Sequence, residues 1–376
     1  MSTTVLPSTT EESLAIVRST APKYWKGESD LTFRNRAMLA FLQKYGVIQL
    51  RANPSYAQTW TVKYKEPPVT TFVDRADIQF NATQLREQLT IDMVAYKATD
   101  SMSLHEYTYN SQSPTQIIDL YRRKSEDLSQ QMTNNFCAEI FNDGYTNLNR
   151  FKGIESFFAT GTTIAADRVA QPSDSYGGNN TTLADKGGAW SSSLTTSPNA
   201  NVATDWPFGT GDPQYDYLAP LIVNTSSTNW SSTSWEENSE ECMQYMRVAQ
   251  MHRCGKAMKS RAPYIHLFGI NRYNDWLTFH RARNTQVVPF KEGIDLGFPD
   301  MINFDGTAVT HDYDVGPDVG YYVCPEMMEF FTPQDMLFKP EGPTWSISDQ
   351  AWLYIITQFG QFRFQPKFFG KYLDVA

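Results

Sequence analysis

The chain has 376 residues, a length that favours two or three packing units over one small module. Its 41 Asp and Glu outnumber 32 Lys and Arg, and a net charge of −9 argues against a protein whose main task is to bind phosphate backbones. With 41% hydrophobic and 19% charged residues, the composition provides for a substantial core and excludes a disordered or collagen-like chain.

The sequence contains no signal for a membrane or a secretory route. No apolar run is long enough for a transmembrane helix, and the polar, acidic start lacks the basic and apolar segments of a secretory signal. The cysteines are far apart and form no CxxC, which predicts buried free thiols in a protein made in the cytoplasm. They are Cys137, Cys242, Cys254 and Cys324.

The first strong helical pattern follows a polar N-terminal arm and covers residues 31–47. Gly46 is placed to end this helix. Its apolar residues cluster on one face: Leu31, Met38, Leu39, Phe41 and Leu42.

Two segments with period two follow, which predicts half-buried strands. In TWTVKYK (59–65) the apolar face comprises Trp60, Val62 and Tyr64, and in QLTIDMVAYK (88–97) it comprises Leu89, Ile91, Met93 and Ala95. About 22 mostly polar residues separate the two strands, longer than a loop in a compact domain. We therefore predict a protruding β-hairpin that reaches a neighbouring subunit. The residues expected at that contact are Trp60, Val62, Tyr64, Phe72 and Phe80.

The longest predicted helix covers residues 113–142. Ser113 can cap it, Pro114 suits its first turn, and Asn142-Asp143-Gly144 supplies the stop. At 1.5 Å per residue the helix is about 40 Å long. A narrow apolar stripe is expected to pack on the rest of the chain: Tyr121, Leu128, Met132, Phe136 and Ile140. The basic triplet at 122–124 favours a solvated helix face, with a nucleic-acid contact as the alternative.

Residues 161–240 contain 23 Ser and Thr and two Gly-Gly pairs, which predicts long, flexible surface loops. A helix is predicted from residue 238, with Asn238 or Ser239 as its cap and Glu240 and Glu241 in its first turn. The later predictions are a strand at 262–270, a helix at 271–283, strands at 306–315, 320–326 and 328–332, and a long C-terminal strand interrupted at Gly360.

The sequence shows no motif for nucleotide, metal or acyl-transfer chemistry. In THDYD, His311 would lie on the opposite strand face from Asp312 and Asp314, so we predict a polar strand end rather than a metal site. A Cys–His nucleophile pair, which could form only in the fold, stays open. We expect no enzyme activity, no metal and no cofactor.

The order of these elements resembles the major capsid proteins of tailed bacteriophages with the HK97-type fold, over nearly the whole chain. NDGYTNLNRFKGIESFFATGT (142–162) is similar to the end of the family's long helix and the glycine-led segment after it. Three further segments resemble the strands and helix of the family's axial domain. They are RAPYIHLFGINRYNDWLTFH (261–280), GFPDMINFDGTAVTHDYDV (297–315) and GYYVCPEMMEFFT (320–332).

The resemblance implies an α+β, HK97-like capsid fold with six parts. These are an N-terminal arm and helix (1–50), an extended hairpin loop with peripheral-domain strands (51–112), a spine helix with the peripheral domain (113–160), a polar loop-rich insertion (161–239), an axial domain (240–345) and a C-terminal strand that returns to the peripheral domain (346–376).

The implied function is the icosahedral shell around the double-stranded DNA genome of a tailed phage, built from hexamers and pentamers in the host bacterial cytoplasm and found in the virion. Expected partners are copies of the chain, a portal, a decoration protein and DNA bound without sequence specificity. Because the long helix already begins at residue 113, we expect a separate scaffolding protein rather than a cleaved scaffold segment.

Two other functions stay open at this stage. An encapsulin-like compartment shares the implied fold and would enclose an enzyme instead of DNA. A β-rich carbohydrate-binding or hydrolytic protein would also use many aromatic residues, and it predicts a monomer with a concave aromatic site and paired carboxylates.

Overall fold

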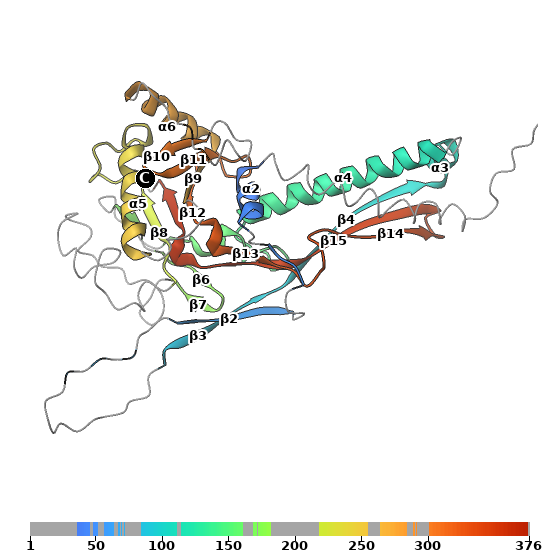
Figure 1. The fold of residues 1–376 in the computed structure, drawn as a ribbon, viewed down its shortest axis with the longest axis horizontal. Coiled ribbons are helices and arrows are strands. Elements are labelled where there is room, and N and C mark those ends of the chain that lie inside the picture. The colour runs from blue at the N-terminus through green and yellow to red at the C-terminus, as the bar shows by residue number, and fades with distance from the viewer. Residues whose placement is uncertain are drawn as a thin grey trace, which may run out of the picture.

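The residues that the computed structural model describes are 36–45, 48–51, 56–63, 84–110, 114–160, 168–170, 172–181, 218–254, 264–283 and 301–374, with single residues at 67, 69, 71, 289 and 291. Helices and strands are mixed, in agreement with the predicted α+β class. The molecule is elongated: one long helix, with a short helix at its outer end, and several strands extend sideways from a broader part (Figure 1).

A five-stranded sheet runs through the extended part. Its central strand, β15 (Ala351–Phe364), pairs with β4 (Val94–Ser103) and β14 (Lys339–Ser346) along its first part. Its last four residues pair instead with β13 (Met328–Phe331), which in turn pairs with the short β1 (Ile48–Gln49). One long strand therefore links the two ends of this sheet.

Helix α4 (Pro114–Ile140) covers one face of β4 and β15 and follows the short helix α3 (Leu104–Asn110) (Figure 1). The predicted long helix is confirmed to within two residues at each end. The chain turns after it at Gly144, whose φ is +70° and where a Cβ atom would lie 2.4 Å from the Phe151 carbonyl oxygen. We call α3, α4, β4, β14 and the part of β15 that pairs with them the arm.

A second sheet of seven strands forms the broader part, which we call the body. Its order is β10 (Ile302–Phe304), β11 (Thr307–His311), β9 (Ile265–Phe268), β12 (Gly320–Val323), β16 (Gly370–Leu373), β8 (Leu221–Asn224) and β5 (Val169–Ala170). Helices α5 (Trp235–Arg253) and α6 (Ile270–Arg283) pack on one face. The predicted strands at 306–315, 320–326 and 328–332 correspond to β11, β12 and β13, but β11 ends at His311 and β12 at Val323, before the predicted ends.

Alternation along the body strands produces two buried layers. On β9, Ile265 and Leu267 join the large core shared with the end of α4, whereas Phe268 joins the core beneath α5 and α6. On β12, Tyr321 stacks on Phe141 with ring centroids 5.7 Å apart. The body sheet is therefore covered on both faces.

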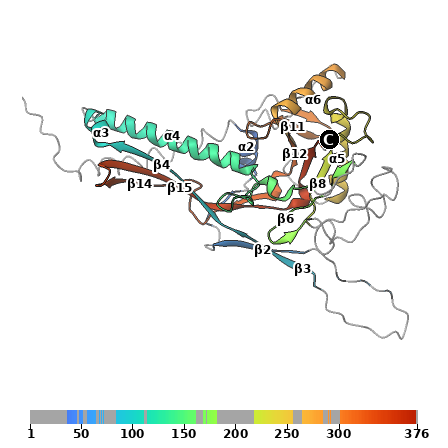
Figure 2. The same cartoon turned by 180° about the vertical axis from the view of Figure 1, so that it is seen from behind.

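Two hairpins lie below the junction of arm and body. The first, β2 (Ala57–Lys63) and β3 (Arg86–Asp92), projects from the molecule and is called the projecting hairpin (Figure 2). The second, β6 (Ser175–Tyr176) and β7 (Asn179–Asn180), is much shorter and lies beside it. The predicted hairpin is thus observed at its base, since residues 64–66 and 72–83 lie outside the described part of the chain.

The strand predicted over 88–97 is interrupted in the middle, which corrects its predicted face. Leu89 and Ile91 are buried as expected, but Val94 is buried and Ala95 is exposed. The reason is a change of partner: β3 pairs with β2 up to Asp92, and β4 begins to pair with β15 at Val94. The intervening residue shifts the alternation by one position.

The C-terminal strand is interrupted after Phe364 and not at Gly360, where the interruption was predicted. Strand β15 continues through Gly360, where a Cβ atom would lie 2.5 Å from the Phe330 ring, so this glycine allows close packing rather than a break. The strand ends before Pro366, and β16 then joins the body sheet next to β8 and β12. The 346–376 segment therefore contributes to both sheets, whereas we expected it to return to one.

The region 161–239, predicted as a loop-rich insertion, supplies two strands of the body sheet. Every residue of β5 and β8 is buried, because cores cover both faces of the sheet here. Ala170 and Ile222 join the main core, and Val169, Leu221 and Val223 join the core beneath α5 and α6. The apolar run 218–223 therefore belongs to the core rather than to a surface loop. Residues 161–167 and 182–217 lie outside the described residues.

Two further predictions need correction. Helix α5 begins at Trp235 with Ser234 at its N-cap, so Glu236 and Glu237, not Glu240 and Glu241, occupy its first turn. Strand β14 was not predicted, because its sequence contains two prolines and a glycine and shows no alternation of apolar and polar residues. It can form a strand because an edge position in a sheet tolerates proline and glycine. Of the helix predicted over 31–47, the described part is α2 (Ala37–Lys44).

Candidate functional site

The apolar stripe of α4 packs in two different environments. Leu128 and Met132 are buried within the arm, between α4 and the sheet, against Trp352 and Tyr354. Nearer the body, Phe136 and Ile140 enter the main core, where the ring centroid of Phe136 lies 5.0 Å from that of Phe330. The side chain of Tyr121, the fifth predicted residue, lies outside the described part. The helix thus fastens the arm to the body along its own length.

The residues predicted to contact a neighbour are only partly described. Trp60 and Val62 are half-buried against the main core of their own chain. The ring of Trp60 lies 6.2 Å from that of Tyr176, and the Arg363 guanidinium lies 5.7 Å from it. Tyr64, Phe72 and Phe80 fall outside the described residues. At the base of the hairpin, therefore, two of the five side chains stabilise their own subunit.

The arm has one sheet face that α4 does not cover. Tyr354 and Ile356 of β15 pack under α4, and the residues between and after them, Ile355 and Thr357, lie on the opposite face and are half-buried. At the end of the arm, Leu104 and Ile347 are 42% and 83% exposed. Among the described residues, nothing covers these apolar positions.

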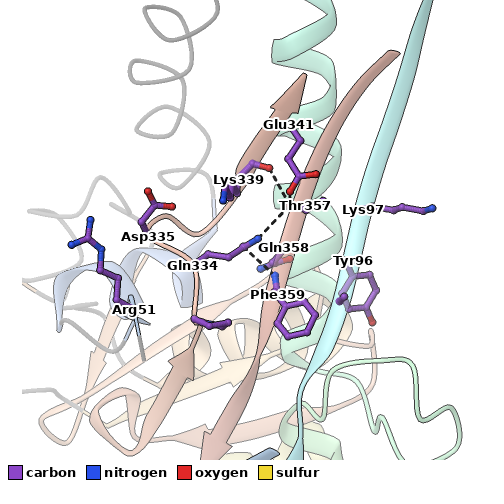
Figure 3. Close-up of a pocket in the computed structure, with 12 residues that line it drawn as sticks. Arg51, Tyr96, Lys97, Gln334, Asp335, Lys339, Glu341, Thr357, Gln358 and Phe359 are labelled. Carbon is purple, nitrogen blue, oxygen red and sulfur yellow. Dashed lines mark hydrogen bonds between the residues drawn. The ribbon is translucent and has the colours of Figure 1, made fainter. Parts of the chain in front are cut away.

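A groove of about 780 Å³ lies on this uncovered face (Figure 3). The side chain of Gln334 lies in the wall of the groove and binds to β15. Its Oε1 accepts from the Phe359 backbone N–H at 3.2 Å, and its Nε2 donates to Thr357 Oγ1 at 3.3 Å. The side chain thereby occupies the gap between the end of the β14 pairing and the start of the β13 pairing. The groove is rimmed by charges of both signs: Arg51, Lys97, Asp335, Lys339 and Glu341.

The THDYD segment has a structural role that sequence reasoning missed. Asp312 Oδ2 accepts from the Met38 backbone N–H at 3.2 Å and so caps the start of α2. Asp314 forms an ion pair with Arg36. Burial, opposed by Arg36, raises the pKa of Asp314 to about 6. Both carboxylates therefore connect the first described residues to the body, and no local signal could have identified so distant a cap.

The side chains of Glu240 and Glu241 bind to other elements instead of completing a helix start. Glu240 Oε1 lies 2.6 Å from His280 Nδ1, which joins α5 to α6. Glu241 accepts from the Ser231 backbone N–H at 3.0 Å and lies 3.6 Å from Arg168. Both acids hold the body together.

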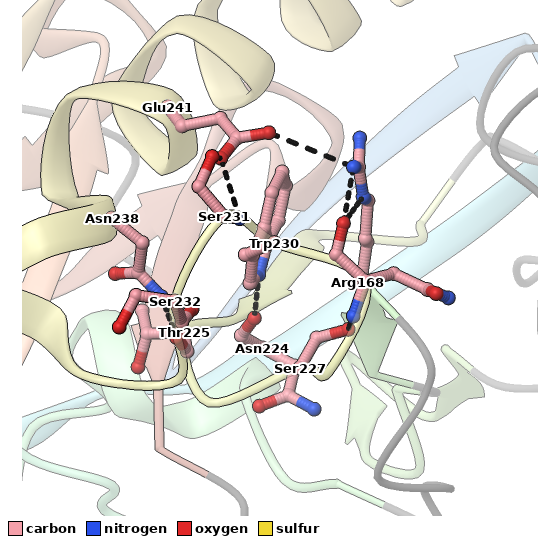
Figure 4. Close-up of polar contacts among 10 residues, drawn as sticks. Arg168, Asn224, Thr225, Ser227, Trp230, Ser231, Ser232, Asn238 and Glu241 are labelled. Atoms are coloured by element: carbon pink, nitrogen blue, oxygen red, sulfur yellow. Dashed lines mark hydrogen bonds and ion pairs between the residues drawn. The ribbon is translucent and has the colours of Figure 1, made fainter.

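The Ser/Thr/Asn-rich loop between β8 and α5 is held by a network of polar contacts (Figure 4). Trp230 Nε1 donates to the Asn224 carbonyl at 2.6 Å, and the Arg168 guanidinium lies 4.2 Å from the Trp230 ring. Asn238, which was predicted as a cap, donates from within α5 to the carbonyls of Thr225 and Ser232. The network fixes this loop, and its polar groups bind one another.

The four cysteines and His266, which could carry chemistry, are buried. All four cysteines are buried free thiols, and burial raises the pKa of Cys137 to about 12, which opposes formation of a thiolate. Burial also lowers the pKa of His266 to about 3, while its Nδ1 lies 2.7 Å from Tyr372 Oη. Within the described residues, no three His, Cys, Asp or Glu side chains are grouped to hold a metal ion.

The basic triplet on α4 is engaged within the subunit where its side chains are described. Arg122 pairs with Glu126, and Lys124 lies 3.2 Å from Asp100. These contacts agree with the predicted solvated helix face. None of the helices in the described residues is long and apolar enough to cross a membrane.

No family model matches the sequence, and no curated protein matches it significantly. Solved structures do match. The capsid of cyanophage A-1(L) is 11% identical, with 89% of this chain and 93% of that chain covered and a TM-score of 0.51. The capsid of a native GTA particle is 10% identical over 91% of both chains, with a TM-score of 0.50.

A virus-like particle from Pyrococcus furiosus is 10% identical, with 96% of this chain and 100% of that chain covered, at a lower TM-score of 0.40. The cyanophage and GTA structures match the fold of this chain over about nine-tenths of its length. The chain therefore has the HK97-like fold of phage capsid proteins.

Proposed function

We propose that the protein is the major capsid subunit of a tailed phage, whose copies assemble as hexamers and pentamers into the icosahedral shell around a double-stranded DNA genome. The observation that carries this proposal is the shared fold with two capsid structures over about nine-tenths of each chain. The shape of the subunit supports it, because the arm has a sheet face with apolar positions that no described residue covers and that another copy can bury.

In this proposal the arm and its sheet are the peripheral domain, α4 is the spine helix and the body is the axial domain. The projecting hairpin is the base of the extended loop. Trp60 and Val62 hold that base to its own subunit, and Tyr64, Phe72 and Phe80 would contact the neighbouring copy. Many modest contacts of this kind, repeated around a closed shell, give a stable particle without one strong site.

The acidic chain suits a container that confines DNA without binding it tightly, given its net charge of −9. The further partners in this proposal are a separate scaffolding protein, a portal and a decoration protein. The aromatic residues that suggested a carbohydrate site instead form the core, as the fully buried Trp276, Tyr322 and Tyr372 illustrate.

The test is assembly of the purified protein, followed by size-exclusion chromatography and electron microscopy. We expect shells, tubes or rings of subunits. A soluble monomer that turns over a small substrate would contradict the proposal. Particles that protect DNA from nuclease support a capsid, whereas particles filled with a protein cargo would indicate a compartment instead.

A shortened hairpin provides a matched variant. Lys63 and Arg86 pair across the hairpin, so an Asn-Gly turn can join them and replace residues 64–85. We expect this variant to fold, as judged by circular dichroism, and to remain unassembled under conditions in which the full chain forms particles. Equal assembly of both proteins would exclude the hairpin as a subunit contact.

A further inference from the structure

The short β6–β7 hairpin lies next to the projecting hairpin and is connected by a tight turn. Gly177 and Gly178 have φ values of +59° and +86°, the left-handed conformation that a two-residue hairpin turn of this kind requires. The Gly-Gly pair, which suggested flexibility in the sequence, therefore forms a defined turn here.

The turn packs tightly on strand β3. The Thr90 backbone N–H donates to the Gly177 carbonyl at 3.2 Å. A Cβ atom at Gly177 would lie 3.0 Å from both Cβ and Cδ2 of Leu89, a buried residue of the same strand. At Gly178 the same atom would meet nothing within 4 Å. Only the first glycine of the turn is thus in close contact with the projecting hairpin.

The residue before the turn is anchored in the core. Tyr176 is fully buried, its hydroxyl accepts from the Phe364 backbone N–H at 2.8 Å, and its ring lies 5.5 Å from that of Phe157. The Gly177 N–H donates to Tyr145 Oη at 3.1 Å. Since Phe364 ends β15 and Tyr145 follows α4, the turn is tied to the end of the longest described strand and to the segment after the longest described helix.

Both strands of the projecting hairpin therefore contact anchored groups at their base. Strand β3 contacts the turn itself, and Trp60 of β2 lies against the ring of Tyr176 and the guanidinium of Arg363. A two-stranded hairpin has little stability or fixed direction by itself. Its direction relative to the body must come from such contacts.

We propose that the β6–β7 turn is a strut that sets the angle at which the projecting hairpin leaves the subunit, with Tyr176 and Gly177 as its positioning residues. The consequence for assembly rests on the proposed function: if the hairpin reaches a neighbouring copy, the strut sets the relative orientation of the two subunits and thus the curvature of the shell.

The test compares Gly177→Ala with Gly178→Ala. Both substitutions introduce a side chain at positive φ in the same turn, but only the first pushes a methyl group against Leu89. Hydrogen exchange of the peptide that covers β3, followed by mass spectrometry, reports contact with the strut. We expect exchange at Thr90 to be at least tenfold faster in Gly177→Ala than in Gly178→Ala. Equal exchange rates in the two variants would contradict the proposal that the turn acts as a strut.

A second variant keeps the test decisive if Gly177→Ala does not fold. Tyr176→Phe preserves the buried ring and removes only the acceptor for the Phe364 N–H. We expect faster exchange in β3 than in the unmodified protein while exchange in α4 is unchanged. Exchange that rises equally in both elements would indicate general destabilisation and would contradict a positioning role.

Assembly provides the last measurement. Electron microscopy of particles from Gly177→Ala should show a broader or shifted diameter distribution, whereas Gly178→Ala should match the unmodified protein. Altered exchange with unchanged particles would refute the effect on curvature. If the unmodified protein forms no particles, the proposed function fails, but the exchange comparison still decides whether the strut exists.

Discussion

The body and the arm bury their strands in different ways. In the body, β8, β9 and β12 are buried at every position, because α5 and α6 cover one face and the end of α4 with the following segment covers the other. In the arm, β15 alternates between residues buried under α4, such as Ile356, and half-buried residues such as Ile355 on the opposite face.

This difference distinguishes residues that stabilise the folded subunit from residues that are available for contacts between subunits. The body completes its core within one subunit, so its apolar residues stabilise the monomer. The arm places part of its apolar surface where nothing in the described chain covers it, including Leu104 and Ile347 at its end. Substitutions in the body should therefore change stability, and substitutions on the uncovered face of the arm should change assembly.

The largest expected effect is a loss of stability when a tryptophan of the body is replaced by alanine, compared with the same replacement in the arm. Trp276 on α6 is fully buried in the body, whereas Trp345 on β14 is half-buried against Trp352, with ring centroids 4.9 Å apart. We expect Trp276→Ala to lower the free energy of unfolding by about 3–5 kcal/mol. Trp345→Ala should cost about 1–2 kcal/mol, because less apolar surface is removed from water there. Urea unfolding measures both, and equal losses would contradict the comparison.

A smaller loss is expected beneath the arm helix. Met132 is buried between α4 and β15, so Met132→Ala should lower the free energy of unfolding by about 2–3 kcal/mol. Met132→Leu, which keeps the volume, should cost less than about 1.5 kcal/mol. If both variants unfold like the unmodified protein, α4 does not contribute to the stability of the arm in solution.

The burial of Asp314, which forms an ion pair with Arg36, predicts the direction in which the stability of the fold changes with pH. Burial raises the pKa of Asp314 from its ordinary 3.8 to about 6, so the folded state binds more protons than the unfolded state between these values. This residue therefore makes stability fall as pH rises from about 4 to about 6. Urea unfolding across that range should give a smaller slope for Asp314→Asn than for the unmodified protein. Identical slopes would show that Asp314 titrates normally.

The smallest effect on folding is expected on the uncovered face. Ile355→Thr keeps a β-branched side chain on a half-buried position and should change the free energy of unfolding by less than about 1 kcal/mol. If copies of the chain pack on this face, the same variant should assemble at a higher protein concentration, as light scattering can measure. A variant that is strongly unstable as a monomer would show that this face is closed within the subunit.

Elements with a local signal were predictable from the sequence. The cap, the proline and the narrow stripe of residues 113–142 predict helix α4, since helix ends and periodicity depend on neighbouring residues. The same holds for β2 and for β9, β11 and β12 of the body sheet. The stripe residues Leu128, Met132, Phe136 and Ile140 are buried for this reason.

Only the tertiary structure decided which segments become partners. The apolar run of β8 lies in a polar region and becomes a strand because β16 and β5 flank it. The face of β4 depends on a change of partner after Asp92. Asp312 caps a helix 274 residues away, and Gly177 supports a strand that precedes it by more than 80 residues. Periodicity describes which face of a segment is apolar, but a partner is selected by the shape and free hydrogen bonds of a surface that exists only after folding.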